Sequence, residues 1–492
     1  MTDNKITITF PDGKVIETPY RTRISDLTDN FNMDREKIFA VKVNNKVYSM
    51  EKHLKYSAEV EPVLYDSKEG IAVYRRSLCL LLAAAAYHIY PDRRLLVGHS
   101  LGSGYYYTLD TEKPICEKDI KALEQEMNAL VKKNLPIESH FVSYDEAVEL
   151  IEKSGLTETR RQMNFLCPPR VRINSIGDFS DLHFGPLVPH TGMLKHFELR
   201  KYGEGFLLRF PKSSDQSKIP EFVDQPKLFE IYRKYKTWGK RLGVTSVASL
   251  NELIVSRKIN DFIDITETLQ EKCISEIASQ IAEKQTARVV LIAGPSSSGK
   301  TTTSKKLALE LQALGYIPKV ISLDCYYVDH SRTPVDENGE PDYECLEALD
   351  IELLNKNLVD LFAGKEVIIP TYNFADGTQS FKEKNKMVLK EHEILIMEGI
   401  HGLNDKLTPK VPAEYKFKIY LSALTQLNLD DHNRIPTSDN RLIRRIVRDS
   451  QFRGKPAAGT RPATITTASK ILSIFFVLVF FISMYLPEFR IH

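Results

Sequence analysis

The alternation of hydrophobic and polar residues is clearest near the N-terminus, where it has a period of two. Residues 5–10 alternate in this way, a Pro-Asp-Gly turn follows, and residues 15–16 resume the pattern. Residues 39–43 and 47–48 flank an Asn-Asn turn and show the same organisation. Two such hairpins predict a small β-rich module over residues 1–65.

Hydrophobic residues in the middle of the chain recur instead at helical spacing. Residues 228–241 and 263–281 both show this spacing, and a polar, turn-rich stretch at 211–218 precedes them. We therefore expect a linker and helical connector over residues 213–286. A further apolar face upstream consists of Ile120, Leu123, Met127, Leu130 and Val131.

From residue 288 onward, short apolar stretches alternate with helical ones. Residues 288–293, 319–323 and 393–397 are predicted to be buried strands, and residues 305–314 are predicted to form a helix. This order is typical of a doubly wound parallel α/β domain. The fold class expected for the whole chain is therefore α/β multidomain.

The loop between the first of these strands and its helix matches the pattern G-x-x-x-x-G-K-[ST]. In such a P-loop, backbone N–H groups and the helix N-terminus hold the phosphates of a nucleotide, while the lysine reaches the terminal phosphates. We therefore predict binding of ATP with Mg²⁺, the metal held by Thr301. The predicted nucleotide-binding residues are Gly294, Pro295, Ser296, Ser297, Ser298, Gly299, Lys300, Thr301 and Thr302.

Two carboxylates follow predicted strands of the same domain. Asp324 ends the strand at 319–323, at the sheet edge where ligands bind, and is a candidate base for a sugar hydroxyl. Glu398 follows the strand at 393–397 and is a candidate Mg²⁺ ligand or partner of the P-loop threonine. A helix-capping role for Asp324 is the alternative.

Arginines gather on one predicted helix near residue 445. Arg441, Arg444, Arg445 and Arg448 are spaced so that three guanidinium groups stack on one helix face. That face suits bidentate binding of phosphate oxygens, with RNA binding or a solvated surface as alternatives.

Composition narrows the expected partners and the expected cellular compartment. Lys and Arg number 67 against 65 Asp and Glu, so no overall charge directs the chain to nucleic acid or membranes. The six cysteines form no C-x-x-C pair, and the N-terminus lacks a signal-peptide profile. We expect a cytoplasmic protein with reduced thiols.

The first 212 residues resemble the N-terminal part of threonyl-tRNA synthetases. The run from Thr9 to Lys14 matches the opening hairpin of their TGS module, a β-grasp fold. Ordered motifs at 75–82, 97–107, 134–138 and 181–189 resemble their second, editing-type domain, which implies an α+β module over residues 66–212.

The module that resembles the editing-type domain lacks most of the residues that line the family's hydrolytic cleft. The family surrounds its hydrolytic cleft with an H-x-x-x-H pair and a C-x-x-x-H pair, and the matching positions here are Arg76, Leu80, His183 and Leu187. One imidazole makes neither a metal site nor an acid/base pair. We expect a retained scaffold in which His183 is structural.

Residues 287–454 resemble the uridine kinase family. Besides the P-loop, the motifs are 324–327, 342–350, 369–374, 397–400 and 441–449. The resemblance implies that Asp324 is the base on a ribose 5′-hydroxyl, that Tyr372 and Phe374 line the nucleoside pocket, and that Arg444, Arg445 and Arg448 lie in a lid over ATP. Lys300 completes the implied catalytic set.

One position departs from that family. Glu344 stands where the family usually has an aspartate that binds the ribose hydroxyls, and its side chain is one methylene longer. The identity of the sugar and of the base therefore stays open. Aromatic side chains stack on any base, so Tyr372 and Phe374 do not select one. The choice between ATP and GTP and the oligomeric state also stay open.

Residues 455–492 resemble no uridine kinase ending. Residues 471–486 carry no charge but are shorter than the ~20 residues of a spanning helix. Three interpretations compete: a C-terminal membrane anchor, a buried core segment, or an ending replaced by a reading-frame shift, which would impair activity.

The sequence therefore predicts an ATP- and Mg²⁺-dependent kinase that phosphorylates a pyrimidine nucleoside, uridine or cytidine, at its 5′-hydroxyl. The alternative is an RNA-associated or regulatory protein that binds a nucleotide without turnover, with RNA contact through the TGS-like module.

Overall fold

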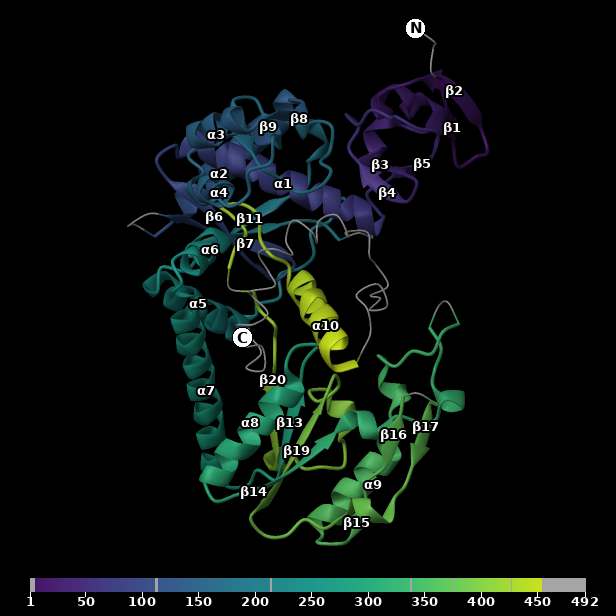
Figure 1. The fold of residues 1–492 in the computed structure, drawn as a ribbon, viewed down its shortest axis with the longest axis vertical. Coiled ribbons are helices and arrows are strands. Elements are labelled where there is room, and N and C mark those ends of the chain that lie inside the picture. Colours follow the sequence, from purple (N-terminus) through teal and green to yellow (C-terminus); the bar gives the residue numbers. More distant parts are fainter. Residues whose placement is uncertain are drawn as a thin grey trace. The chain divides into compact units, whose positions relative to one another are not determined.

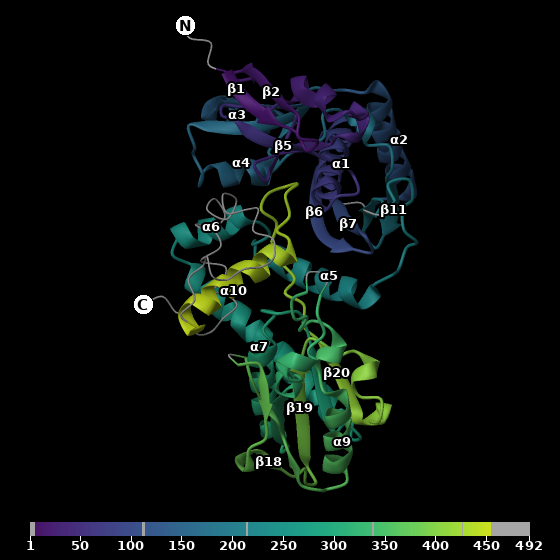
Figure 2. The ribbon, with the colours of Figure 1, turned by 90° about the vertical axis from the view of Figure 1, so that its right-hand side faces the viewer.

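The computed structural model describes residues 5–110, 114–212, 215–336, 339–374, 376–425 and 427–453. Within these the chain divides into two compact units (Figures 1 and 2). Of the described residues, the first contains those up to Ile259 together with the segment Leu424–Pro436, and the second contains Asn260–Ala423 and residues 437–453. The hydrophobic tail at 471–486 lies outside the described residues.

The first unit begins with a mixed five-stranded sheet of order β2-β1-β5-β3-β4. β1 pairs with β5 in parallel, whereas the two hairpins are antiparallel, as the alternating pattern predicts. Gly13 turns the first hairpin with a φ of 82°, a conformation that glycine adopts without strain. The strands are β1 (Lys5–Thr9), β2 (Val15–Pro19), β3 (Ala40–Val43), β4 (Lys46–Tyr48) and β5 (Ala58–Val63).

The rest of the first unit contains two antiparallel sheets and several helices. One sheet has the order β11-β12-β7-β6 and the other β10-β9-β8. The strands are β6 (Arg94–Leu101), β7 (Gly104–Asp110), β8 (Ile137–Ser143), β9 (Arg170–Ile176), β10 (Phe179–Asp181), β11 (Glu198–Tyr202) and β12 (Gly205–Arg209). The helices are α1 (Lys68–Ile89), α2 (Glu117–Lys133), α3 (Tyr144–Lys153), α4 (Thr157–Met163), α5 (Pro226–Arg241) and α6 (Val247–Val255).

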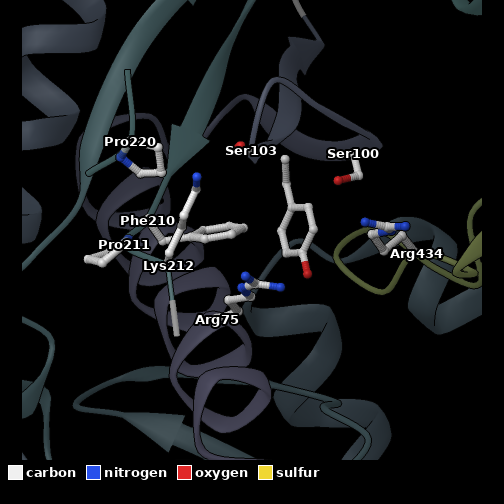
Figure 3. Close-up of a pocket in the computed structure, with 9 residues that line it drawn as sticks. Arg75, Ser100, Ser103, Phe210, Pro211, Lys212, Pro220 and Arg434 are labelled. Atoms are coloured by element: carbon white, nitrogen blue, oxygen red, sulfur yellow. The ribbon is translucent and has the colours of Figure 1, made fainter. Parts of the chain in front are cut away.

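A pocket of about 290 Å³ opens beside the first of these sheets (Figure 3). Its wall comes from α1, from β6, β7 and the turn between them, from the chain that follows β12, and from the segment Leu424–Pro436. The lining residues are Arg75, Ser100, Ser103, Tyr105, Phe210, Pro211, Lys212, Pro220 and Arg434.

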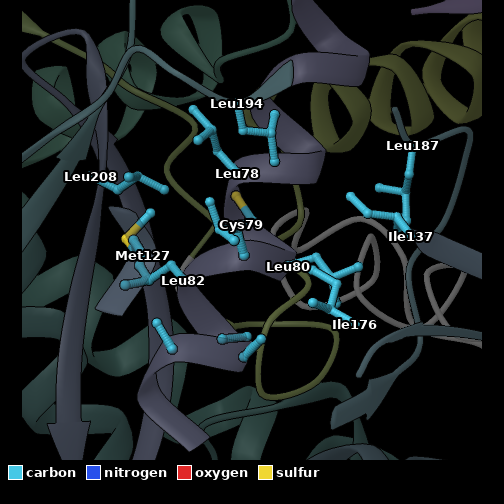
Figure 4. Close-up of a cluster of buried hydrophobic side chains, with 14 of the residues drawn as sticks. Leu78, Cys79, Leu80, Leu82, Met127, Ile137, Ile176, Leu187, Leu194 and Leu208 are labelled. Carbon is cyan, nitrogen blue, oxygen red and sulfur yellow. The ribbon is translucent and has the colours of Figure 1, made fainter. Parts of the chain in front are cut away.

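Helix α1 forms the centre of the first unit's core (Figure 4). Ser67 caps it by accepting a hydrogen bond from Gly70 N at 2.9 Å, and Leu78 and Leu80–Leu82 are fully buried. Among the described helices α1 is long and apolar enough to span a membrane, but 78% of its apolar window is buried inside the domain. Such burial is typical of a core helix.

The second unit is built on a four-stranded parallel sheet of order β14-β19-β13-β20, and the predicted α/β fold class is therefore confirmed. The main strands are β13 (Val289–Ala293), β14 (Ile317–Ser322), β19 (Glu393–Gly399) and β20 (Lys416–Tyr420). Short hairpins pair β15 (Val367–Ile368) with β18 (Lys386–Met387) and β16 (Thr371–Asn373) with β17 (Thr378–Ser380). The helices are α7 (Ile259–Glu283), α8 (Lys300–Ala313), α9 (Ile351–Phe362) and α10 (Thr437–Arg453).

Helices cover both faces of this sheet (Figure 1). Val289 and Leu291 of β13 pack with α9, whereas Val290 and Ile292 pack with α7 and α8. The buried run of β13 is apolar at every position because both of its faces are covered.

Candidate functional site

The loop after β13 has the backbone conformation of a phosphate-binding loop. Gly299 caps the N-terminus of α8. Its φ of 95° lies in a region that residues with a side chain rarely adopt. A Cβ on Gly294 would lie 2.6 Å from the carbonyl oxygen of Leu421, so only glycine fits. The loop therefore brings its backbone close to the positive end of the α8 dipole.

Two serines of this loop leave polar atoms unsatisfied. The hydroxyl oxygens of Ser297 and Ser298 are buried and have no hydrogen-bond partner in the structure. Ser297 also has a φ of 60°, in the left-handed region that residues other than glycine rarely adopt. Unpaired buried hydroxyls and a strained backbone fit a loop shaped for phosphate oxygens.

The lysine and the threonine of the motif point to different partners. Lys300 Nζ donates to the carbonyl oxygen of Pro295 at 3.3 Å, and Thr301 Oγ1 donates to Glu398 Oε1 at 2.9 Å. Glu398 is buried at the end of β19, which runs through it to Gly399 instead of ending at residue 397. A hydroxyl and a carboxylate in contact are hard oxygen ligands of the kind that Mg²⁺ prefers.

Asp324 lies in a 3-10 turn, Leu323–Tyr326, directly after β14. Its side chain is exposed, so substrate can reach it. Burial lowers the pKa of Lys300, and the negative charges of Glu398 and Asp324 oppose that shift. The structure thus brings Lys300, Glu398 and Asp324 into one electrostatic site at the carboxyl edge of the sheet.

The arginines of α10 reach the same loop. Arg441 Nε donates to the carbonyl oxygen of Ser296 at 2.9 Å. A Cβ built on Gly299 would lie 3.5 Å from Arg444 Nη2, so this guanidinium lies against the loop as well. The charges of Arg441 and Arg448 both lower the pKa of Lys300. Arg445 is half-buried on the same helix.

Thr302, the last of the predicted nucleotide-binding residues, lies in the first turn of α8.

The predicted nucleoside residues form part of a larger aromatic group. The ring centroids of Tyr372 and Phe374 are 4.9 Å apart, and Tyr327 lies 5.5 Å and 5.8 Å from them. Tyr343 is 5.5 Å from Tyr327, and its hydroxyl lies 3.4 Å from that of Tyr372. Glu344 is exposed next to this group and contributes to the raised pKa of Tyr327, after burial and Asp324.

Two residues of this region were not assigned a site role from the sequence. Tyr327 and Tyr343 lie inside the motifs at 324–327 and 342–350. Their position within those motifs was the available signal. The contact between Arg441 and Ser296 joins residues 145 positions apart, which spacing alone does not reveal.

In the first unit, the positions that match the editing cleft serve other purposes. Arg76 Nη1 donates to the carbonyl oxygen of Pro186 at 2.6 Å. Leu80 and Leu187 are buried in the core, and His183 Nε2 lies 3.3 Å from Asp181 Oδ2. No group of three or more His, Cys, Asp or Glu that could hold a metal occurs among the residues the structure describes.

We expect the domain to be unable to hydrolyse seryl-tRNA, since three of the four cleft positions carry side chains that neither bind a metal nor transfer protons at neutral pH. The measurement is deacylation of seryl-tRNA(Thr) by the full chain compared with buffer. Deacylation above background that disappears in His183→Ala would contradict this expectation.

The segment Leu424–Pro436 contributes a buried histidine to this region. His432 Nδ1 lies 2.8 Å from Asp181 Oδ2, and both side chains are almost fully buried. Asp431 Oδ2 accepts hydrogen bonds from the backbone and hydroxyl of Thr159. Asp430 accepts from the backbone N–H groups of His432 and Asn433. Spacing along the sequence does not indicate this cluster, because His432 and Asp181 are 251 positions apart.

Burial and charge shift the pKa values of this cluster in opposite senses. Burial opposes the charged form of His432, but the carboxylates of Asp181, Asp431 and Asp430 outweigh it and raise the pKa of His432. Burial, with the charge of Asp181, raises the pKa of Asp430 to about 8. His432 is therefore favoured as the cation and Asp430 as the neutral acid in the folded unit.

These shifts predict that the first unit loses stability as the pH rises. The contribution of His432 is complete below its ordinary pKa of 6.5 and is lost above its raised value, and that of protonated Asp430 is lost between pH 3.8 and about 8. Because one pKa unit corresponds to ~1.4 kcal/mol, we expect a loss of at least about 1 kcal/mol between pH 6 and 8.5. Thermal unfolding across this range measures it.

The slope of that pH dependence separates the cluster from other titrating groups. His432→Gln should flatten the slope, whereas His140→Gln, which alters an exposed histidine on β8, should leave it unchanged. An identical slope in wild type and His432→Gln would contradict the assignment.

Comparison with known proteins agrees with this division of the chain. Residues 289–466 match the model of the phosphoribulokinase/uridine kinase family. The N-terminal region is similar to threonine–tRNA ligases. That of Desulforamulus reducens is 33% identical over 203 residues, which cover 39% of this chain and 31% of the relative. Threonine–tRNA ligase 2 of Bacillus subtilis is 33% identical over 199 residues, covering 39% of this chain and 31% of the relative.

The chain thus spans about a third of the length of these curated relatives. Among solved structures, one from Bacillus stearothermophilus described as a possible uridine kinase is 24% identical, covers 27% of this chain and 70% of that chain, and has a TM-score of 0.23. The family match confirms the predicted resemblance to the uridine kinase family and extends it to residue 466, and the similarity to threonine–tRNA ligases confirms the resemblance of the N-terminal part. The family match supports a small-molecule kinase, a phosphotransferase, in the second unit.

Proposed function

We propose that the protein transfers the γ-phosphoryl group of ATP to the 5′-hydroxyl of a pyrimidine nucleoside, uridine or cytidine. The observation that carries this proposal is the convergence of Lys300, Asp324, Glu398 and the arginines of α10 on one P-loop. Phosphoryl transfer needs held phosphates, a metal, neutralised charge and a positioned hydroxyl, and each need has a residue here.

The residues of the loop fit a nucleotide with Mg²⁺. The unpaired hydroxyls of Ser297 and Ser298 and the N-terminus of α8 supply donors for phosphate oxygens. Thr301 and Glu398 would hold Mg²⁺, directly or through water, since their oxygens are already in contact. Bound there, Mg²⁺ would neutralise phosphate charge during transfer.

Asp324 would act as the base. Its exposed carboxylate accepts the proton of the 5′-hydroxyl while the hydroxyl oxygen bonds to the γ-phosphorus and the bond to the β-phosphate oxygen breaks. Lys300 and the guanidinium groups of Arg444, Arg445 and Arg448 would bind the phosphate oxygens on which charge is redistributed.

The aromatic group would form the base pocket. Tyr327, Tyr343, Tyr372 and Phe374 offer ring surfaces for stacking, and Glu344 would accept hydrogen bonds from the ribose hydroxyls. Incubation with ATP, Mg²⁺ and a panel of nucleosides, followed by detection of monophosphates, tests the proposal. Absence of turnover on every nucleoside, with bound nucleotide demonstrated, would overturn it.

We expect Phe374→Ala to raise the nucleoside KM about tenfold with little change in kcat, because stacking on an aromatic side chain contributes ~1–3 kcal/mol per base. Phe374 is 62% exposed, so its removal should not disturb the core. Steady-state kinetics measure the effect, and Phe381→Ala, which removes another exposed phenylalanine, serves as control. Equal KM values in the two variants would exclude Phe374 from the pocket.

A second candidate is RNA association without turnover, which the similarity of the N-terminal region to threonine–tRNA ligases favours. A gel-shift with tRNA at physiological salt tests it. Binding weaker than the ordinary non-specific range of ~10⁻⁴–10⁻⁶ M would remove this candidate.

A further inference from the structure

The pocket of about 290 Å³ in the first unit has an unusual charge composition (Figure 3). Three of its nine lining residues are cations, Arg75, Lys212 and Arg434, and none is a carboxylate. Cations gathered in a pocket lining that contains no carboxylate repel one another, and a bound anion would relieve this repulsion.

Aromatic rings hold two of these cations in place. The guanidinium of Arg75 lies 4.6 Å from the ring centroid of Phe210, and that of Arg434 lies 4.8 Å from the ring of Tyr105. The two rings also contact each other edge to face at 5.1 Å. Guanidinium groups fixed in this way lose little side-chain freedom when they bind an anion.

One of the arginines also has an unsatisfied donor. Arg75 Nε is buried and has no hydrogen-bond partner in the structure. Buried N–H groups are almost always paired, so this donor is available to an acceptor bound in the pocket. Ser103, which also lines the pocket, has a φ of 62°, a strained conformation of the kind that gathers at ligand sites.

The position of Arg434 is fixed by contacts of the chain that leads to it. Asn433 Nδ2 donates to the carbonyl oxygen of Leu182 at 2.6 Å, and Asn428 Nδ2 donates to that of Val97 at 2.6 Å. The segment Leu424–Pro436 interrupts the second unit in sequence but belongs to the first unit. It thus places the Arg434 guanidinium among residues of the synthetase-like domain. The pocket is a built feature of this chain, since a synthetase-like domain alone lacks that arginine.

We propose that this pocket binds a small organic phosphate of sugar-phosphate size, with its phosphate group held by Arg75, Lys212 and Arg434. A volume of about 290 Å³ lies at the lower end of small-molecule sites and leaves room beyond a phosphate group. Ser100 and Ser103 offer polar partners for sugar hydroxyls. One face of Phe210 and one face of Tyr105 are each occupied by a guanidinium group, which reduces the ring surface open to a base.

Calorimetric titration of the full chain tests the proposal with ribose 5-phosphate, inorganic phosphate and UMP as probes. Ribose 5-phosphate should bind wild type, and Lys212→Gln and Arg434→Gln should each weaken binding at least about tenfold. Lys218→Gln removes a nearby exposed charge outside the pocket and should leave the affinity unchanged. Circular dichroism melts of each variant verify that it is folded.

The kinase site also attracts phosphates, so the titration is repeated in Lys300→Ala. Binding that persists in Lys300→Ala but weakens in Lys212→Gln belongs to the pocket, whatever the kinase substrate is. Absence of binding, equal affinity in all folded variants, or weakening by Lys218→Gln would overturn the proposal. So would inorganic phosphate or UMP binding more tightly than ribose 5-phosphate, or displacement of the probe by tRNA, which would assign the pocket to RNA.

Discussion

Asp324→Asn is expected to lower kcat by about 10²–10⁴-fold while the affinity for ATP stays close to that of the wild type. The amide keeps the shape of the side chain but accepts no proton from the attacking hydroxyl. Asp324 is exposed after β14, so the amide that replaces its carboxylate is not a buried polar group. Steady-state turnover and equilibrium binding of ATP, measured on the same preparation, separate the two effects.

Glu347→Gln provides the matched control for this substitution. Glu347 is an exposed carboxylate of the same domain, so its neutralisation changes the net charge equally. It should alter kcat less than about twofold, because long-range charge effects at exposed sites are screened. Comparable losses in both variants would show that general electrostatics, and not a base at Asp324, determine the rate.

The sequence predicted the elements that carry the nucleotide site because each depends on local patterns. The apolar runs within 288–293 and 393–397 and the glycine spacing of the loop are all local signals. The end of a parallel strand also places a residue at a known edge of the sheet. Asp324 and Glu398 were therefore assigned to one site before any contact was known.

Contacts between distant parts of the chain could not be predicted in this way. His432 meets Asp181 across 251 positions, and Arg434 completes a pocket whose other lining residues come from 75–220. No periodicity or spacing indicates that a segment inside the kinase range packs with the first unit. Only the folded chain brings these charged groups together. Their shifted pKa values and unpaired donors depend on burial, which cannot be read from the sequence.

The P-loop lysine provides the second large expected effect. In the structure Lys300 Nζ donates to the loop's own carbonyl oxygen at Pro295, at 3.3 Å, a neutral partner that a phosphate can replace. Burial lowers the pKa of Lys300, and the charges of Glu398 and Asp324 favour its cationic form. A desolvated cation of this kind binds the terminal phosphates more strongly than an exposed one does.

Lys300→Ala should therefore weaken nucleotide binding at least about tenfold and reduce turnover at least about 10³-fold, since it removes charge stabilisation needed during transfer. Titration with a fluorescent ATP analogue and the monophosphate assay measure the two losses. Lys305→Ala, at an exposed position of the same helix, should change neither. If Lys300→Ala keeps more than a tenth of wild-type turnover, the loop does not act on the transferred phosphate, and the phosphoryl transfer proposed here must be assigned to another site.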